Sequence, residues 1–524
     1  MRPSSSPSDR HGDAGLFDGV LAAGQVRAAV DDHAWVRAML DAEAALARAA
    51  ARTGTATAAD AEAVAAACAR LDVDPGELGA EAAGTGNPVV PLIRRLRAAL
   101  PEPVAPLVHR GATSQDIMDT AAMLVAHRAL APLLADLAAS VSLTAALADR
   151  HRGTVLAGRT LLQQALPTTF GLVAAGWLTG LDSARRRLAE VREHRLAAQL
   201  GGAAGTLAAY GDPPPDAAAP DAAGPVGAGP AGADHAGPVR GGGGPGGAGP
   251  AGADHAGPVR GGVGTGGAGP AGTGPDGADR AGPVRGGVGP GGDPGLLMLA
   301  AFSAEVGLAE PELPWHTERT RIAELAGALG AAAGAVAKVA RDLTLFAQTE
   351  VGELAEGGDA GGSSTLPHKH NPIAAVSAAA AAAQAPGLVA TLLAAMAHEH
   401  QRAAGAWHAE WQPLRALLVA TGSAAYQLRR ALDGLRVDAG RMRANLDLTH
   451  GALLAERVAG ALRPALGTGA HAAVRAAVAR GALGTDPAIT AHLDPATLAG
   501  LLDPGSYLGS ADALIDRALR AARR

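Results

Sequence analysis

The stretch "IMDTAAMLVAHRALAPLLADLAASVSLTAALADRHR", residues Ile117 to Arg152, is apolar at roughly every third or fourth position. This spacing places the apolar side chains on one broad stripe of a helix. Similar periodic runs follow elsewhere in the chain: Asp31–Gly54, Thr168–Leu200, Thr317–Glu356 and Trp407–Leu435. The run Thr317–Glu356 would extend ~60 Å as one helix, at about 1.5 Å per residue. Because alternating strand patterns are absent, the sequence predicts an all-α fold built on a bundle of long helices.

The composition supports helices and excludes several classes of protein. The chain has 524 residues, enough for a large buried core, and only 2% of them are aromatic. The core must therefore consist mainly of Ala, Leu and Val, and small side chains suit close helix packing. A net charge of −6 does not indicate a nucleic-acid or membrane-surface partner. The single cysteine, Cys68, excludes an intramolecular disulfide and a cysteine-rich metal site, and is expected to be a small buried apolar residue on a helix.

Neither the N-terminal segment nor the most apolar run is expected to indicate export or membrane insertion. The first 15 residues lack the apolar stretch of a secretory signal, and we expect them to form a flexible tail. The most apolar run, "AAVSAAAAAAQAPGLVATLLAAMA" at 374–397, is mostly alanine and contains Gln384 and Pro386. We expect a buried bundle helix there, no membrane partner, and a cytoplasmic protein.

One segment, at about 213–294, breaks the helical pattern. It consists largely of Gly, Pro and Ala, and near-identical copies of "GAGPAGADHAGPVRGG" start at Gly227 and Gly247. These repeats carry too few apolar side chains to bury a core, so a disordered insertion between two helices is expected. Such an insertion costs little stability, because loop-closure entropy grows slowly with length.

The segment "GGSSTLPHKHNP", Gly361–Pro372, has a composition that points to chemistry. Lys369 is one of only two lysines in the chain, and Asn371 is one of only three asparagines. Ser363 could serve as a base if the glycine-rich backbone and the Lys369 cation favour its alkoxide. Lys369 and Asn371 could hold a substrate carboxylate. The surrounding glycines are typical of a lid that closes over a substrate.

Four further segments carry polar side chains beside apolar runs. In "HRGATSQDIMDT", residues 109–120, Thr113 and Ser114 precede the first long helix, where they could cap it, bind an anion, or do both. The other polar candidates are Gln163 and Gln164 in "GRTLLQQALPTTFG", Asn87 in "TGNPVVPLIR", and Arg402 in "HEHQRAAGAWHAEW". For Arg402 two interpretations stay open, a substrate carboxylate contact and a structural salt bridge. The histidines around it have neither the spacing nor the acidic partners of a metal site.

Residues 362–372, "GSSTLPHKHNP", match the signature G-S-S-x-[ML]-P-x-K-x-N-P, so the chain resembles the fumarase/aspartase superfamily. Its phrases "GATSQDIMDT", "PWHTERTRIAELA" and "AGAWHAEW" are similar to those of the bacterial 3-carboxy-cis,cis-muconate cycloisomerase branch. The resemblance implies a three-domain all-α subunit and a homotetramer with a twenty-helix core. It divides the chain into a tail (1–15), an N-terminal helical domain (16–110), a central bundle (111–436, with the insertion) and a C-terminal helical domain (437–524).

The resemblance also implies roles for individual residues. It implies that three subunits share each active site, that the substrate is a small tricarboxylate, and that no metal or organic cofactor is needed. The flexible-loop serine of the family corresponds to Ser363, and its carboxylate-binding residues correspond to Lys369 and Asn371. Substrate contacts are implied at Thr113, Ser114, Gln163, Asn87 and Arg402.

Gln164 departs from the family pattern, because the resemblance implies a histidine there in many superfamily lyases and in cycloisomerase relatives. An amide does not titrate and cannot protonate an amine that leaves a substrate. In lactonisation a carboxylate oxygen adds to a conjugated double bond. In the reverse reaction this carboxylate is the leaving group, and because the pKa of its acid is ~4, it needs no proton to leave. Gln164 therefore favours a cycloisomerase over the first alternative, an enzyme like adenylosuccinate lyase. The second alternative is an inactive helical scaffold that uses the insertion as an interaction element.

Overall fold

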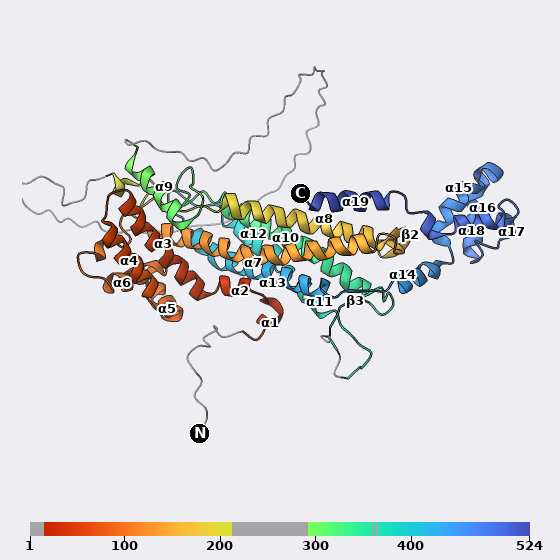
Figure 1. Cartoon of the computed structure of the whole chain (residues 1–524), viewed down its shortest axis with the longest axis horizontal. Coiled ribbons are helices and arrows are strands. Elements are labelled where there is room, and N and C mark those ends of the chain that lie inside the picture. Colours follow the sequence, from red (N-terminus) through yellow and green to blue (C-terminus); the bar gives the residue numbers. More distant parts are fainter. Residues whose placement is uncertain (1–14, 212–291, 359–360, 363–364) are drawn as a thin grey trace, which may run out of the picture. The chain divides into compact units, whose positions relative to one another are not determined.

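The computed structural model of the chain (Figure 1) describes residues 15–211, 292–358, 361–362 and 365–524. Most of the insertion predicted at 213–294, and Ser363, lie outside the described residues. Residues 292–294 are described: Asp293 caps a helix that begins at Pro294, so these residues belong to the helical part of the chain.

The described chain is mostly helical, with four short strands, which confirms the predicted fold class. The helices before the bundle are α1 (Asp18–Leu21), α2 (Val26–Ala29), α3 (Asp32–Arg52), α4 (Ala58–Arg70), α5 (Pro75–Thr85) and α6 (Val89–Ala98). Those of the middle of the chain are α7 (Ser114–Arg150), α8 (Phe170–Glu190), α9 (Pro294–Val306), α10 (Thr320–Phe346), α11 (Ile373–Ala382), α12 (Ala385–Ala394) and α13 (Ala406–Leu432). The last helices are α14 (Ala439–Leu446), α15 (Ala455–Leu466), α16 (Ala470–Ala479), α17 (Pro487–Thr490), α18 (Pro495–Leu501) and α19 (Ala511–Ala522).

The long helices α7, α8, α10 and α13 pack side by side with α11 and α12, as Figure 1 shows. Their interface is made of Ala, Leu and Val, with a few large residues such as Trp177 and Phe170 fully buried. Helix α3 packs on α4, α7 and α9, and joins the N-terminal helices to this core. Cys68 is buried in α4 as expected, and desolvation raises the pKa of its thiol to about 12.

Two predicted helices are shorter than the sequence indicated. The run Thr317–Glu356 ends as helix α10 at Phe346, so 27 helical residues extend roughly 40 Å instead of ~60 Å. The next residues turn through Gly352, whose φ of +61° belongs to the left-handed region, into strand β3 (Leu354–Ala355), which pairs with β4 (Arg436–Val437). The run Thr168–Leu200 is helical only over α8, because Thr169 is the N-cap and a π turn (Val191–Arg195) ends it.

The expectation that strands are absent is wrong, because a second strand pair precedes α8. Strand β1 (Val155–Thr160) pairs antiparallel with β2 (Gln163–Thr169) in a hairpin at the end of α7. Its two loop residues, Leu161 and Leu162, have φ of +50° and +64° and are exposed. Hairpin loops of this kind usually contain Asn or Gly. A Leu-Leu loop carries no such signal, so the hairpin could not be predicted from its turn residues.

Three described segments are long and apolar enough to cross a membrane by length and composition alone: Ser114–Arg150, Thr320–Phe346 and Ile373–Ala394. They correspond to α7, α10 and the pair α11–α12 of the bundle. In each segment, only a third to a half of the most apolar stretch of 18 residues is buried within the described chain. Each of these segments therefore has residues that the described chain leaves uncovered, among them the large apolar Ile373, Val376 and Leu393 of α11 and α12.

Candidate active site

The first predicted cluster lies at the N-terminus of α7. Thr113 has extended backbone angles and is the N-cap, and Ser114 is the first helical residue. The Asp116 carboxylate accepts a hydrogen bond from the Thr113 backbone N–H over 2.9 Å. The capping role predicted for this segment is therefore confirmed, with Asp116 as an additional member.

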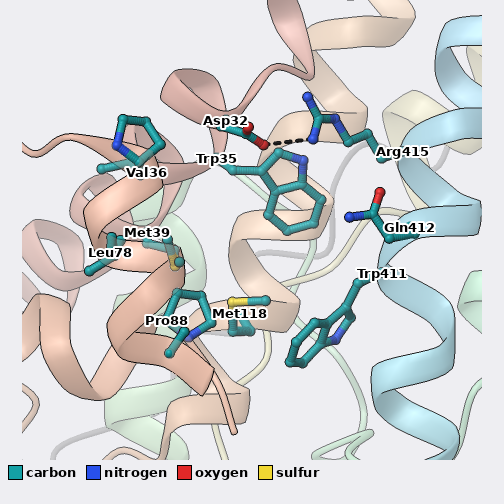
Figure 2. A pocket seen from close by; sticks show the side chains of 13 residues that line it. Asp32, Trp35, Val36, Met39, Leu78, Pro88, Met118, Trp411, Gln412 and Arg415 are labelled. Atoms are coloured by element: carbon teal, nitrogen blue, oxygen red, sulfur yellow. Dashed lines mark hydrogen bonds and ion pairs between the residues drawn. The ribbon is translucent and has the colours of Figure 1, made fainter. Parts of the chain in front are cut away.

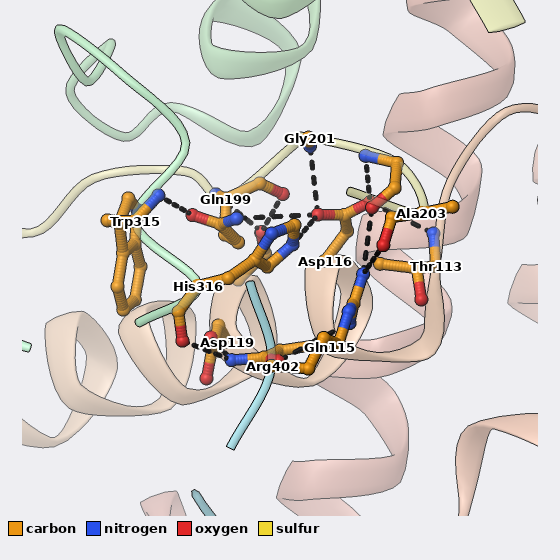
Figure 3. Close-up of polar contacts among 12 residues, drawn as sticks. Thr113, Gln115, Asp116, Asp119, Gln199, Gly201, Ala203, Trp315, His316 and Arg402 are labelled. Atoms are coloured by element: carbon orange, nitrogen blue, oxygen red, sulfur yellow. Dashed lines mark hydrogen bonds and ion pairs between the residues drawn. The ribbon is translucent and has the colours of Figure 1, made fainter. Parts of the chain in front are cut away.

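Asp116 is fully buried and joins three segments at this helix end (Figure 3). It accepts hydrogen bonds from the backbone N–H groups of Gly201 (2.9 Å) and Gly202 (3.0 Å). Its Oδ1 also lies 2.6 Å from Nε2 of His316, which precedes α10. Because these donors use both oxygens, the carboxylate holds the loop 199–203 over the start of α7 and has a structural role.

A second buried charge cluster lies one turn further along α7. Arg319 is 2% exposed and donates to both oxygens of Asp119, over 2.8 and 3.1 Å. It also donates to Glu410 of α13, and the Trp407 indole N–H donates to Asp119 over 3.0 Å. Burial raises the pKa of Glu410, while the Arg319 hydrogen bonds act in the opposite direction. The cluster ties α7, the start of α10 and α13 together beside the first site.

Arg402 lies next to these clusters and differs from Arg319 in its partners. It is half-buried, and it donates to the side-chain oxygen of Gln115 over 3.3 Å. It also donates to the carbonyl oxygens of Gly202 (2.8 Å) and Ala203 (3.3 Å). Burial lowers its pKa. No carboxylate within the described residues forms an ion pair with Arg402, so the salt-bridge interpretation has no support there.

Asn87 lies near the same end of the bundle but uses its side chain locally. Its Oδ1 accepts from the Val89 backbone N–H over 3.1 Å at the start of α6, and Nδ2 donates to Thr85 O. The carbonyl of the preceding Gly86 lies 3.0 Å from Nε2 of His408 at the start of α13. The substrate contact predicted for Asn87 stays a prediction.

The second group of predicted residues lies on the β1–β2 hairpin. Gln163 is exposed at the first position of β2. Gln164 donates to the carbonyl oxygen of Asn445 over 2.9 Å, and its own Oε1 is buried without a donor in the described part of the chain. Arg159 of β1 binds Glu353 with two hydrogen bonds, and Asn445 donates to the same carboxylate over 2.7 Å. These contacts fix the hairpin against the segment that leads into the signature loop.

The described part of that loop is closed at its base by Asn371. Both the backbone N–H and the side-chain Nδ2 of Asn371 donate to Gly361 O, over 2.9 and 3.0 Å. Gly361 has φ of +91°, and a Cβ there would lie 2.1 Å from Asn371 O, so the position requires glycine. Glu356 accepts the backbone N–H groups of Ala374 and Ala375 at the start of α11. Lys369 is exposed.

The structure does not bring all the predicted residues together in one chain. Thr113 and Ser114 lie at the beginning of α7, and the hairpin with Gln163 and Gln164 follows its end. The 37 residues of α7 extend roughly 55 Å at about 1.5 Å per residue, far more than the length of a small acid. A substrate cannot touch both groups within one subunit.

Sequence reasoning missed the buried acids Asp116, Asp119, Glu353 and Glu410 and their partner Arg319. The available signal was weak: two aspartates three residues apart lie inside an otherwise apolar stretch. A buried charge is costly unless it is paired, so such positions mark interactions with distant segments. The partners themselves are around 200 positions away for Asp116 and Asp119, and no local pattern identifies them.

The fold and this arrangement define the class of the protein, and comparison with known proteins agrees. The family described as "Lyase" matches residues 17–220 and 297–387, and the chain belongs to this family. It is 39% identical to a 3-carboxy-cis,cis-muconate cycloisomerase of Bradyrhizobium diazoefficiens, over 97% of this chain and 98% of the relative. It is 40% identical to a nitrosuccinate lyase of Streptomyces davaonensis, over 97% and 94% of the two chains. The crystal structure of the Pseudomonas putida 3-carboxy-cis,cis-muconate lactonizing enzyme superposes with a TM-score of 0.77 at 34% identity, and covers 97% of this chain and 99% of that one.

Proposed function

We propose that this protein is a cycloisomerase that converts 3-carboxy-cis,cis-muconate into 4-carboxymuconolactone, a step of protocatechuate breakdown in the β-ketoadipate pathway. The observation that carries the proposal is the end-to-end similarity to cycloisomerases in sequence and in fold. Similarity limited to the signature loop would support only the superfamily.

The residues of the site support a role for each part of the reaction. One carboxylate oxygen of the substrate adds to the conjugated double bond, and the electron pair moves to the carbon beside a second carboxylate. Lys369 stabilises the resulting aci-carboxylate, together with the Asn371 amide, whose Nδ2 has one N–H without an acceptor among the described residues. Ser363, which lies outside the described residues, delivers the proton to that carbon.

A third carboxylate would bind at the start of α7. The helix N-terminus at Thr113 and Ser114 favours an anion, and Arg402 adds a cation whose described partners are all neutral oxygens. Gln163 and Gln164 would contribute from the hairpin. Gln164 would donate a hydrogen bond that orients the attacking carboxylate, a positioning role that needs no titrating group.

The proposal includes a homotetramer with shared sites. The roughly 55 Å between the two groups of residues means that a complete site needs more than one subunit. The uncovered residues of α7, α10 and α11–α12 would pack on their copies in a twenty-helix core and not on lipid. Exposed Ile373, Val376 and Leu393 on α11 and α12 fit such an interface. We place the enzyme in the cytoplasm, with domain borders near residues 110 and 436.

A second candidate function is the elimination of nitrite from nitrosuccinate, because a nitrosuccinate lyase is as similar to this chain as the cycloisomerase. In that reaction a base removes a proton from one carbon, the adjacent C–N bond breaks, and nitrite and fumarate leave. Nitrite departs as an anion, so Gln164 is compatible with this chemistry as well. The two functions differ in the number of substrate carboxylates.

Parallel assays decide between the two reactions. The purified protein is mixed with 3-carboxy-cis,cis-muconate while the diene absorbance is followed, and separately with nitrosuccinate while nitrite is measured. We expect fast loss of the diene absorbance and little nitrite. Release of nitrite with an unchanged diene would assign the second function, and no reaction with either substrate would support an inactive scaffold.

A further inference from the structure

A buried amide, Gln115, stands between the charge clusters and Arg402. Gln115 is the second residue of α7 and is 1% exposed. Its Nε2 donates to Asp119 Oδ2 over 3.1 Å and to the His316 carbonyl oxygen over 2.7 Å. Both donors of the amide are therefore used, and both point to the interior of the protein (Figure 3).

The neighbours of Gln115 also determine which way its amide faces. A reversed amide would place its oxygen against a carboxylate and a carbonyl, which offer no hydrogen to donate. The oxygen must therefore face outward, where it accepts from Arg402 Nη1 over 3.3 Å. Asp119, which fixes the nitrogen, is itself fixed by two hydrogen bonds from Arg319. A chain of contacts thus runs from Arg319 through Asp119 and Gln115 to Arg402.

The position of Gln115 leaves Arg402 with unused capacity. A guanidinium has five N–H donors, and those of Arg402 reach Gln115, Gly202 and Ala203 in the described residues. Nε and one hydrogen of Nη1 have no acceptor among the described residues, and these donors are left for a carboxylate. The described hydrogen-bond partners of Arg402 are all neutral, while the Asp116 and Asp119 carboxylates favour its charged form without bonding to it. A glutamate at position 115 would have a similar shape but would form a direct ion pair with Arg402.

We propose that Gln115 is a positioning residue that orients Arg402 for a substrate carboxylate through a neutral contact, at a position where a carboxylate would form an ion pair with it. The inference rests on the proposed function for the assignment of Arg402 to substrate binding. Gln115 itself acts through Arg402. Gln115 therefore affects the binding of a carboxylate, and its role does not depend on the later chemical step.

A double-mutant cycle in the full-length protein tests the proposal. The binding of tricarballylate, a tricarboxylate that cannot lactonise, is measured by calorimetry for the native protein, Gln115→Met, Arg402→Gln and the double variant. We expect Gln115→Met to weaken binding about tenfold in the native background, the size of one hydrogen bond to a charged group. In the Arg402→Gln background the same change should have almost no effect, because residues that act through one another are not additive.

Two further variants separate positioning from general damage. Gln115→Glu should weaken tricarballylate binding more than Gln115→Met, because it adds the counter-charge. Gln427 is a matched control, since this α13 glutamine is 2% exposed and accepts from Arg430 over 3.0 Å. Gln427→Met should lower the melting temperature to a similar degree without changing the affinity. If Gln115→Met does not fold, Gln115→Asn takes its place in the cycle, because its shorter amide cannot make all three contacts.

Several outcomes would overturn the proposal. They are additive effects of the two substitutions, equal affinities for Gln115→Glu and Gln115→Met, and no binding of tricarballylate by the native protein. The proposed function can fail separately. If the protein does not lactonise 3-carboxymuconate but shows the expected double-mutant cycle with tricarballylate, the proposed function is wrong. The role of Gln115 in positioning Arg402 would still hold.

Discussion

Arg159 and Glu353, 194 positions apart, form a two-pronged ion pair with N–O distances of 2.8 and 2.6 Å. The glutamate side chain is fully buried, and Asn445 donates to it as well. Through this pair the β1–β2 hairpin is attached to the segment just before the signature loop. The geometry of Gln163 and Gln164 therefore depends on a residue that lies in neither sequence motif.

Glu353→Ala should destabilise the protein strongly, because it leaves the Arg159 cation without its counter-charge. We expect a loss of about 3 kcal/mol in the free energy of unfolding, at the lower end for a broken buried pair because Arg159 is partly exposed. The matched control is Glu324→Ala, which breaks a two-pronged pair with Arg195 that is 42–52% exposed. That variant should lose less than about 1 kcal/mol. Equal melting temperatures for the two variants would show that burial of the first pair contributes nothing.

Lys369→Met should abolish most activity without unfolding the protein. The side chain is exposed, so it contributes little packing, whereas loss of a charge stabiliser costs about 100-fold or more in turnover. The chain provides one matched control, because its other lysine, Lys338, is also exposed and pairs with Asp342 on α10. Lys338→Met should keep its turnover. Turnover numbers and melting curves of both variants check the prediction, and unfolding of the Lys369 variant would assign that lysine to the fold.

Ser363→Ala should reduce turnover by at least about two orders of magnitude, the usual effect of removing an acid–base group. Ser364→Ala, which removes the neighbouring hydroxyl, should retain most of the turnover. Both rates are measured with saturating 3-carboxymuconate. A Ser363 variant with near-native turnover would remove this serine from the mechanism.

The Gly/Pro/Ala insertion should be dispensable for catalysis. Replacing 213–291 by a short Gly/Ser link preserves Asp293, which caps α9, and Pro294, which opens it. We expect unchanged assembly and activity, measured by light scattering and the diene assay. A longer replacement that also removes Asp293 and Pro294 should lower stability by about 1 kcal/mol, the usual cost of a lost N-cap. Dissociation of the shorter variant would show a structural role for the insertion.

The features that could be predicted from the sequence depend on local patterns, whereas the features that could not be predicted depend on long-range contacts. The helices α3, α7 and α13 follow from apolar spacing, and Asp31 and Gly54 mark the ends of α3 as expected. The hairpin was missed because its tip is the exposed pair Leu161-Leu162, which lacks the Asn or Gly typical of such turns, and because its attachment through Arg159 depends on the distant Glu353. The residues around Arg402 were partly foreseen. The role of Gln115 was not, since it depends on Asp119 and on a carbonyl about 200 positions away.

Gln164 tests the chemistry most directly, because an amide occupies a position where the family resemblance implies an imidazole. Its Nε2 donates to Asn445 O over 2.9 Å, and its Oε1 is buried without a described donor. Gln164→Leu should slow lactonisation, because it removes the hydrogen bond that orients the carboxylate. Gln164→His can still donate and should retain substantial activity. The pH–rate profile of the histidine variant should gain an ionisation near about 6.5 that the native profile lacks. The native protein should not cleave adenylosuccinate. Efficient cleavage of adenylosuccinate without reaction on 3-carboxymuconate would contradict both the role of Gln164 and the proposed function.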